Sequence, residues 1–99
     1  MKLVIKNSDA KNKRLVAIFT DKGKSKKVNF GLKNPKIGTY IDTGDTVARK
    51  NYIKRHEVNE KKFYKDPHRA ATLSRFILWG ESKSLKQNIE LYKNKFNLS

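Results

Sequence analysis

The stretch Leu15-Val16-Ala17-Ile18-Phe19-Thr20 decides the fold, because it is a short apolar run rich in β-branched side chains and bounded by polar segments. These features predict a β-strand. Successive side chains of a strand point to opposite sides, so this strand carries apolar residues on both of its faces. We therefore expect a strand that is covered on both faces.

Two shorter runs of the same kind flank this strand, at Leu3–Ile5 and Lys27–Phe30. Polar turn segments separate the three runs, which predicts a three-stranded antiparallel meander. In the last run, Val28 and Phe30 alternate with polar residues. The third strand should therefore be half exposed.

The stretch Gly31–Gly44 holds three glycines and one proline, and it predicts a loop with a short extended piece at Thr39–Ile41. Loops carry functional residues more often than regular elements do, so this segment is a functional candidate. From Asp45 onward, apolar residues recur at helical spacing, and Asp45 or Thr46 can cap the first helix. This first helix is the most basic of the expected elements.

Two further helices follow. The pair Asp66-Pro67 can cap and open the second helix, and Gly80 can end it as a left-handed stop. The buried stripe of this helix consists of Ala70, Leu73, Phe76 and Ile77, widened by Leu78 and Trp79. The third helix starts at Ser84, which opens a capping box of the form Ser-x-x-Gln. Its apolar face consists of Leu85, Ile89, Tyr92 and Phe96.

The sequence thus predicts an α+β fold, in which an N-terminal three-stranded antiparallel β-meander packs against three C-terminal α-helices. Residues 1–99 should form a single small basic domain, with a β-rich part and loop at 1–44 and a helical part at 45–97. A chain of this length allows one modest core, because two separate domains would each be too small.

Charge is the main guide to a partner. Twenty-four Lys and Arg residues against nine Asp and Glu residues give a net charge of +15. A field of this size attracts polyanions such as DNA, RNA or an anionic membrane face, and the attraction falls steeply with salt. A lysine-rich surface also arises from an AT-rich genome or from selection for solubility. The charge therefore argues for association without naming the partner.

Cysteine is absent, which excludes disulfides, thiol catalysis and thiolate-bound zinc and agrees with a reducing compartment. No apolar run approaches the roughly 20 residues that span a bilayer. The first five residues resemble the start of a signal peptide, but polar residues follow them at once. We expect a soluble protein that is not secreted.

Candidate catalytic residues are sparse. His56 and Glu60 lie one helical turn apart and His68 stands near Asp66, but neither pair matches a metalloenzyme spacing such as His-Glu-x-x-His. The glycines are too widely spaced to form a phosphate-cradling loop. A nuclease would need convergent carboxylates, which only folding can bring together. We expect no catalytic residues, no metal and no cofactor.

Two basic regions are candidates for a phosphate-binding surface. One lies around the third strand and the following loop, where flexible lysines can follow a phosphate chain. The other is the first helix, where arginines add bidentate contacts that lysine cannot make. The expected nucleic-acid-binding residues are Lys26, Lys27, Lys33, Lys36, Arg49, Lys50, Lys54 and Arg55. For each region the alternative interpretation is a solvated face with no ligand. Trp79 is expected in the core rather than as a base-stacking platform.

The second half of the chain carries a long composite motif. It contains Tyr52-Ile53-x-Arg55-His56, then Glu60, Asp66-Pro67, Leu73-Ser74-Arg75 and Ile77-Leu78-Trp79. This motif resembles the signature of small basic proteins of unknown function from large DNA viruses of protists, the nucleocytoplasmic large DNA viruses. Val28-x-Phe30-Gly31-x-Lys33 also resembles the strand-and-loop entry of that family, and the motif ends in Leu85, Ile89, Tyr92-Lys93 and Phe96, so the similarity covers most of residues 28–96. It implies a viral setting, in the virion or in the cytoplasm or viral factory of an infected host cell.

The motif residues are interpreted as structural. They are His56, Glu60, Asp66, Pro67, Arg75 and Trp79. Arg55, His56, Glu60 and Arg75 are expected to form a polar network that joins the first two helices. If Arg55 and Arg75 instead lie exposed beside Arg49 and Lys50, the motif becomes a phosphate clamp.

We therefore expect a non-enzymatic basic viral protein that binds nucleic acid, preferably DNA, through phosphate contacts that do not depend on sequence. The alternative is a minor capsid or cementing protein whose basic face meets acidic capsid surfaces. A metal-dependent nuclease is the third interpretation. The sequence leaves open the oligomeric state and the choice between DNA and RNA.

Overall fold

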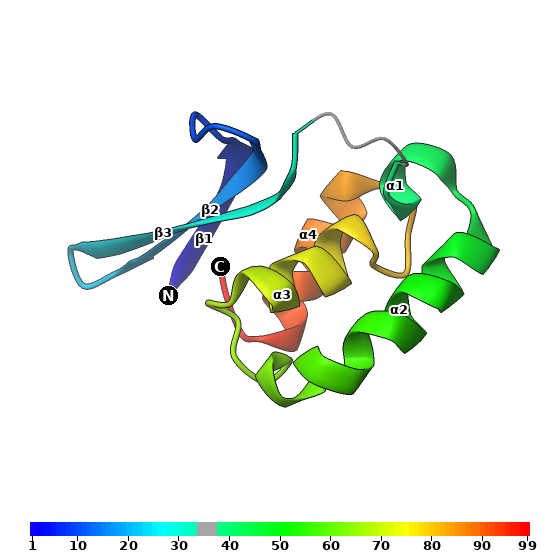
Figure 1. Cartoon of the computed structure of the whole chain (residues 1–99). Coiled ribbons are helices and arrows are strands. Elements are labelled where there is room, and N and C mark those ends of the chain that lie inside the picture. The colour runs from blue at the N-terminus through cyan, green and yellow to red at the C-terminus, as the bar shows by residue number, and fades with distance from the viewer. Residues whose placement is uncertain (34–37) are drawn as a thin grey trace.

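The structure, a computed structural model that describes residues 1–33 and 38–99, confirms the α+β fold (Figure 1). Strands β1 (Lys2–Asn7), β2 (Lys13–Asp21) and β3 (Lys24–Leu32) form one antiparallel sheet in the order β1-β2-β3. The helical part consists of α1 (Tyr40–Thr43), α2 (Thr46–Glu60), the 3-10 turn η1 (Lys61–Phe63), α3 (Ala70–Leu73), its π-helical continuation η2 (Ser74–Leu78) and α4 (Leu85–Lys95). The three expected strands are confirmed, and each is longer than the run that predicted it.

A tight turn joins β2 to β3. Its two residues, Lys22 and Gly23, have positive φ angles of 51° and 79°. This is the type I′ geometry, whose twist matches that of the flanking antiparallel strands. The turn sets the register that pairs Asp21 with Lys24 and Leu15 with Phe30.

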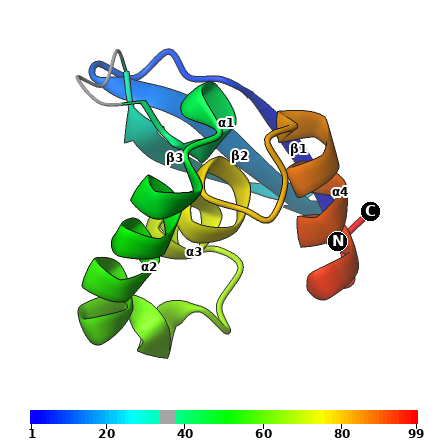
Figure 2. The same cartoon turned by 90° about the vertical axis from the view of Figure 1, so that its right-hand side faces the viewer.

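One face of the sheet builds the core. Its apolar side chains pack against α3 and η2, and α4 lies beside η2 in the same layer (Figures 1 and 2). The buried cluster consists of Leu3, Leu15, Ala17, Phe19, Phe30, Leu73, Ile77, Leu78 and Tyr92. On the opposite face Val16 is buried and Ile18 half-buried, but Val4 is 41% exposed. No described helix covers that face, so the expected cover of β2 on both sides is confirmed only in part, by the burial of Val16 and the half-burial of Ile18.

The expected extended piece at Thr39–Ile41 is also wrong, because Tyr40–Thr43 form the helical turn α1. The carboxylate of Asp42 accepts hydrogen bonds from the backbone N–H and the hydroxyl of Thr39, both at 2.8 Å. These bonds stabilise the first turn of the helix. Gly44 then ends it in the left-handed conformation, with φ 68°.

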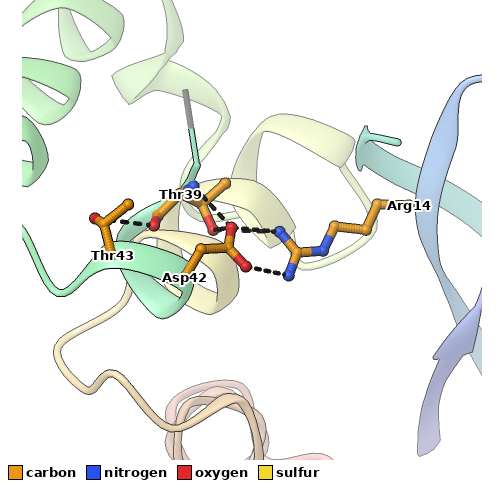
Figure 3. A network of polar contacts seen from close by, with 4 residues as sticks. All are labelled: Arg14, Thr39, Asp42 and Thr43. Atoms are coloured by element: carbon orange, nitrogen blue, oxygen red, sulfur yellow. Dashed lines mark hydrogen bonds and ion pairs between the residues drawn. The ribbon is translucent and has the colours of Figure 1, made fainter. Parts of the chain in front are cut away.

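An ion pair ties this helical turn to the sheet. Arg14 of β2 donates two parallel hydrogen bonds of 2.8 Å to the two carboxylate oxygens of Asp42 (Figure 3). A bidentate arginine–carboxylate contact fixes both distance and orientation. The Arg14 guanidinium, helped by Thr39, holds the pKa of Asp42 far below its usual range.

The second helix begins and ends differently from the prediction. Asp66-Pro67 opens a turn and not a helix, because the Asp66 carboxylate accepts the N–H of His68 at 3.0 Å, and α3 starts only at Ala70. Ala70 is exposed and does not belong to the buried stripe. Gly80 is not left-handed. A side chain at Gly80 would stand 2.3 Å from the carbonyl oxygen of Phe76, so glycine is needed there for space.

The other two helix starts are confirmed. The carboxylate of Asp45 accepts hydrogen bonds from the backbone N–H groups of Val47 and Ala48, both at 3.0 Å. The hydroxyl of Ser84 accepts a hydrogen bond from the backbone N–H of Gln87 at 3.2 Å. The buried Asn88 was not anticipated from the sequence. Its amide donates to the carbonyls of Ile77 (2.8 Å) and Ser82 (2.7 Å) and thereby joins η2 to the start of α4.

The core assignment predicts a large effect at Ile77, which is 0% exposed. We expect Ile77→Ala to lower the free energy of unfolding by about 2–5 kcal/mol, because the change leaves a cavity between sheet and helix. The matched control is Val58→Ala on the outside of α2, where the side chain is 81% exposed. The control should stay within about 0.5 kcal/mol in urea unfolding. Equal effects at both positions would contradict the described core.

The ion pair predicts a pH dependence. The pKa of Asp42 is lowered in the folded protein, so the unfolded chain takes up the proton first as pH falls. The stabilisation is complete at neutral pH and declines progressively below about pH 4, the ordinary range of aspartate. The difference in unfolding free energy between the native chain and Asp42→Asn should therefore shrink in acid. A difference that stays constant from about pH 7 to about pH 3 would contradict this role. Asp9→Asn, in an exposed loop, is the control.

Candidate nucleic-acid interface

Helix α2 has an inward and an outward face. Between Thr46 and Lys62, every exposed charged side chain is basic, since Glu57 and Glu60 are half-buried on the inward face. The exposed basic residues are Lys50, Lys54, Arg55, Lys61 and Lys62; we call them the α2 surface. Three of them were expected from the sequence. The lysines at 61 and 62 were missed because they follow the helix in η1, which the apolar spacing did not indicate.

Arg49 points inward instead. Its Nε donates to the carbonyl oxygens of Trp79 (3.2 Å) and Gly80 (2.8 Å), and Nη1 of Arg75 donates to the same Trp79 oxygen at 3.3 Å. The last carbonyls of a helix carry partial negative charge, so cations there are stabilising. The two guanidinium groups therefore cap the end of η2. Arg49, an expected phosphate contact, has its Nε committed to this cap.

Three stacked rings hold α2 against η2. The Tyr52 ring lies 4.3 Å from the Trp79 ring at an interplanar angle of 5°, and 4.0 Å from the His56 ring on its other side. Trp79 is half-buried and packs on the edge of the core. Aromatic pairs of this kind contribute about 0.5–1.5 kcal/mol beyond the area they bury. Trp79 was expected in the core and lies at its periphery, facing α2.

Of the expected polar network between the first two helices, only the contact of His56 with Glu60 is present among the described residues, and it lies within α2 and does not join the helices. Nδ1 of His56 lies 3.3 Å from Oε1 of Glu60, and Arg75 is half-buried nearby. Arg55 is exposed and belongs to the α2 surface. The alternative phosphate clamp is not assembled as expected either, because Arg75 shares the inward face with Arg49 while Arg55 points outward.

Burial sets the electrostatics of this inward face. It raises the pKa of Tyr52 and Tyr64, and the Glu60 carboxylate raises both further. Burial and the positive charge of Arg49 lower the pKa of Arg75. The hydroxyl of Tyr64 and Oε2 of Glu60 are buried without a hydrogen-bond partner among the described residues. In residues 1–33 and 38–99, no three metal-ligating side chains come together.

A second basic surface lies on the sheet. Every residue from Thr20 to Lys27 is exposed, and this hairpin holds four lysines and a single acid, Asp21. In the register Lys27 stands beside Ile18 and Ile18 beside Val4, so Lys27 lies on the open face, as do Lys2 and Lys6, which flank Val4. Lys24 and Lys26 alternate with Lys27 and lie on the other side, that of Phe19, but both are exposed at the hairpin. We call the following residues the sheet surface: Lys2, Lys6, Lys22, Lys24, Lys26 and Lys27.

The remaining expected contacts lie elsewhere. Lys33 is exposed just after β3, and its backbone N–H bonds to the carbonyl of Asn12 at the far end of the sheet from the hairpin turn. Lys36 lies outside the described residues. The expected set therefore does not form one continuous patch.

The two surfaces lie on opposite sides of the helical layer of α3 and α4 (Figures 1 and 2). The tip of the β2–β3 hairpin and α2 lie at opposite ends of the molecule in Figure 1, and after the turn to Figure 2 α2 stands in front with the sheet behind. The longest principal extent is 41 Å, against 27 and 25 Å for the others. The layer of α3, η2 and α4 separates the surfaces (Figure 1).

Acidic side chains are largely engaged within the molecule. Carboxylates pair with basic groups at Asp42–Arg14, Glu60–His56, Asp66–Arg69 and Glu90–Lys93. The Asp45 carboxylate caps α2. The net positive charge of the protein therefore lies on side chains that face solvent.

The fold and the two surfaces define a small basic α+β domain. In comparisons with known proteins, residues 3–56 match a family described as a family of unknown function, DUF5754. This match covers more than half of the chain, including the sheet, α1 and α2 as far as His56, and the chain belongs to that family. No curated protein and no solved structure matches the chain significantly. The resemblance to proteins of large DNA viruses stays a prediction.

The described part of the chain contains no helix of the length and apolarity needed to cross a bilayer.

The capping role of Arg49 predicts that replacing it lowers the stability of the fold, whereas replacing its neighbour Lys50 does not. We expect Arg49→Met to lower the free energy of unfolding by about 1.5–3 kcal/mol, the range for hydrogen bonds made by a charged group. Lys50→Met, on the α2 surface, should change it by less than about 0.5 kcal/mol. Urea unfolding followed by the emission of Trp79, the single tryptophan, measures both. Similar values for the two variants would rule out the cap.

Proposed function

We propose that this protein is a non-enzymatic, sequence-independent nucleic-acid-binding protein that attaches to duplex DNA through phosphate contacts. The observation that carries the proposal is the α2 surface, where five basic side chains are exposed without an acidic one among them. Lysine and arginine on a convex helix face are chemically suited to phosphate oxygens. The net charge of +15 adds a long-range attraction to any polyanion.

The spacing on α2 suits a repeating charge. Lys50 and Lys54 lie one turn apart, which separates them by about 6 Å along the helix axis. Arg55 sits beside Lys54 and adds a planar fork that can hold a phosphate with two hydrogen bonds. A duplex presents a negative charge about every 1.7 Å of its axis, so several registers satisfy the same side chains. This tolerance supports binding that is independent of sequence.

The salt dependence of binding tests the proposal. Each lost phosphate contact should reduce the slope of log affinity against log salt by about 0.9. We expect Lys54→Gln to weaken binding to two unrelated duplexes equally and to lower the slope by about that amount. Fluorescence anisotropy at several salt concentrations measures affinity and slope together. Lys86→Gln on α4, exposed but in neither surface, is the matched control.

Two results would overturn the proposal. If the protein binds neither duplex at low salt, the basic surfaces bind a different partner. Binding to the acidic surface of a viral capsid protein would be tested next. A loss at Lys54→Gln that differs strongly between the two sequences would indicate base readout instead of phosphate contact.

A further inference from the structure

We infer that this protein bridges two nucleic-acid duplexes, one held by the α2 surface and one by the sheet surface. The inference rests on the proposed function, since it requires that basic side chains bind phosphates. It goes further by assigning the protein two separate sites for the same ligand. The placement of the two surfaces, and not their charge alone, supports bridging.

The two surfaces are similar in charge and both are exposed. The α2 surface has five basic side chains, and the sheet surface has six beside the single carboxylate of Asp21. Each therefore has enough cations to hold a duplex through several phosphates. Neither surface is occupied by a packed element: Lys2, Lys6 and Lys27 lie on the sheet face that no described helix covers, and Lys22, Lys24 and Lys26 are exposed at the β2–β3 hairpin (Figures 1 and 2).

Position prevents the two surfaces from acting as one patch. The β2–β3 hairpin, which carries four of the six sheet-surface lysines, and α2 lie at opposite ends of the molecule (Figure 1), whose longest principal extent is 41 Å. The Debye length at physiological salt is about 8 Å, so one surface contributes little to the potential at the other. A stiff duplex, with a persistence length of about 50 nm, bends around so small a body only at high cost. Two duplexes therefore satisfy both surfaces better than one.

The body between the surfaces is held together by specific contacts. Leu73, Ile77 and Leu78 pack η2 and α3 on the sheet, and the Trp79–Tyr52 stack with the Arg49 cap holds α2 on η2. The Arg14–Asp42 ion pair adds a second connection, from β2 to α1. The surfaces are thus fixed on one rigid support, and binding at one end leaves the other end directed away.

The test uses two duplexes of the same sequence. One is biotinylated and immobilised on beads, and the other carries a fluorophore and stays in solution. Retention of fluorescence on the beads after adding the full-length protein reports bridging. Anisotropy with the fluorescent duplex alone reports single-duplex binding and so tests the proposed function separately.

Three charge-matched variants give the comparison. Lys24, Lys26 and Lys27 are changed to Gln in the sheet-surface variant. Lys50, Lys54 and Arg55 are changed to Gln in the α2-surface variant. Lys83, Lys86 and Lys95, which are exposed and belong to neither surface, are changed to Gln in the control. Each variant loses three positive charges, and urea unfolding followed by Trp79 emission checks that all of them fold.

We expect the native protein and the control variant to retain the second duplex. Both surface variants should still bind a single duplex through the intact surface but lose retention by about tenfold or more, as expected for three lost phosphate contacts. Bridging is overturned if the native protein binds one duplex without retaining the second. It is also overturned if either surface variant retains the second duplex as well as the control does, since self-association through one surface would explain that result. If no duplex binds at all, the proposed function and this inference fail together.

Discussion

Burial of one face of the sheet against α3 and η2 holds the strands and helices of this protein together. Phe30 and Ala17 from the strands and Leu73 and Ile77 from the helix are all 0% exposed. Burying each large side chain contributes about 1.5–3 kcal/mol. Because the helical layer occupies this face, α2 is placed beyond that layer and the other sheet face stays open to solvent (Figure 1). The arrangement of the basic residues follows from this layering.

The attachment of α2 is of a different kind. None of its residues is fully buried, and it is held by ring stacking and by hydrogen bonds to the end of η2. Such a helix gains little from the apolar core, so its inward residues need specific partners. The outward side chains of α2 are not needed for this attachment, and several of them are lysine or arginine. The separation of structural and solvent-facing roles along one helix is what makes α2 a candidate interface.

The sequence predicted most of the architecture and only part of the interface. Short runs of β-branched and aromatic residues between polar turn segments identified all three strands, and Asp45 and Ser84 marked two helix starts, because these signals act locally. The turn at Tyr40–Thr43 was missed because Thr39 and Asp42 resemble a loop until Arg14, distant in sequence, pairs with the carboxylate. Gly80 was misread because its need for space arises from Asn88 and the Phe76 carbonyl, which only folding brings near.

The same distinction applies to the basic residues. Lys50, Lys54 and Arg55 were correctly expected to project outward, since helical spacing separates them from Tyr52 and Ile53. Arg49 could not be assigned inward from spacing alone, because its partners are the carbonyls of Trp79 and Gly80 at the end of another helix. That the two basic regions lie at opposite ends is a property of the tertiary layering and has no local signal.

The most direct measurement is amide chemical-shift mapping by NMR, with isotope-labelled protein titrated with a short duplex. Shifts should concentrate on the amides of α2 around Lys50, Lys54 and Arg55 and on those of the β2–β3 hairpin around Lys24 and Lys27. The amides of η2 and α4 should change little. Shifts confined to α4, or spread through the core around Ile77, would contradict the claim that the outward basic surfaces bind the phosphates.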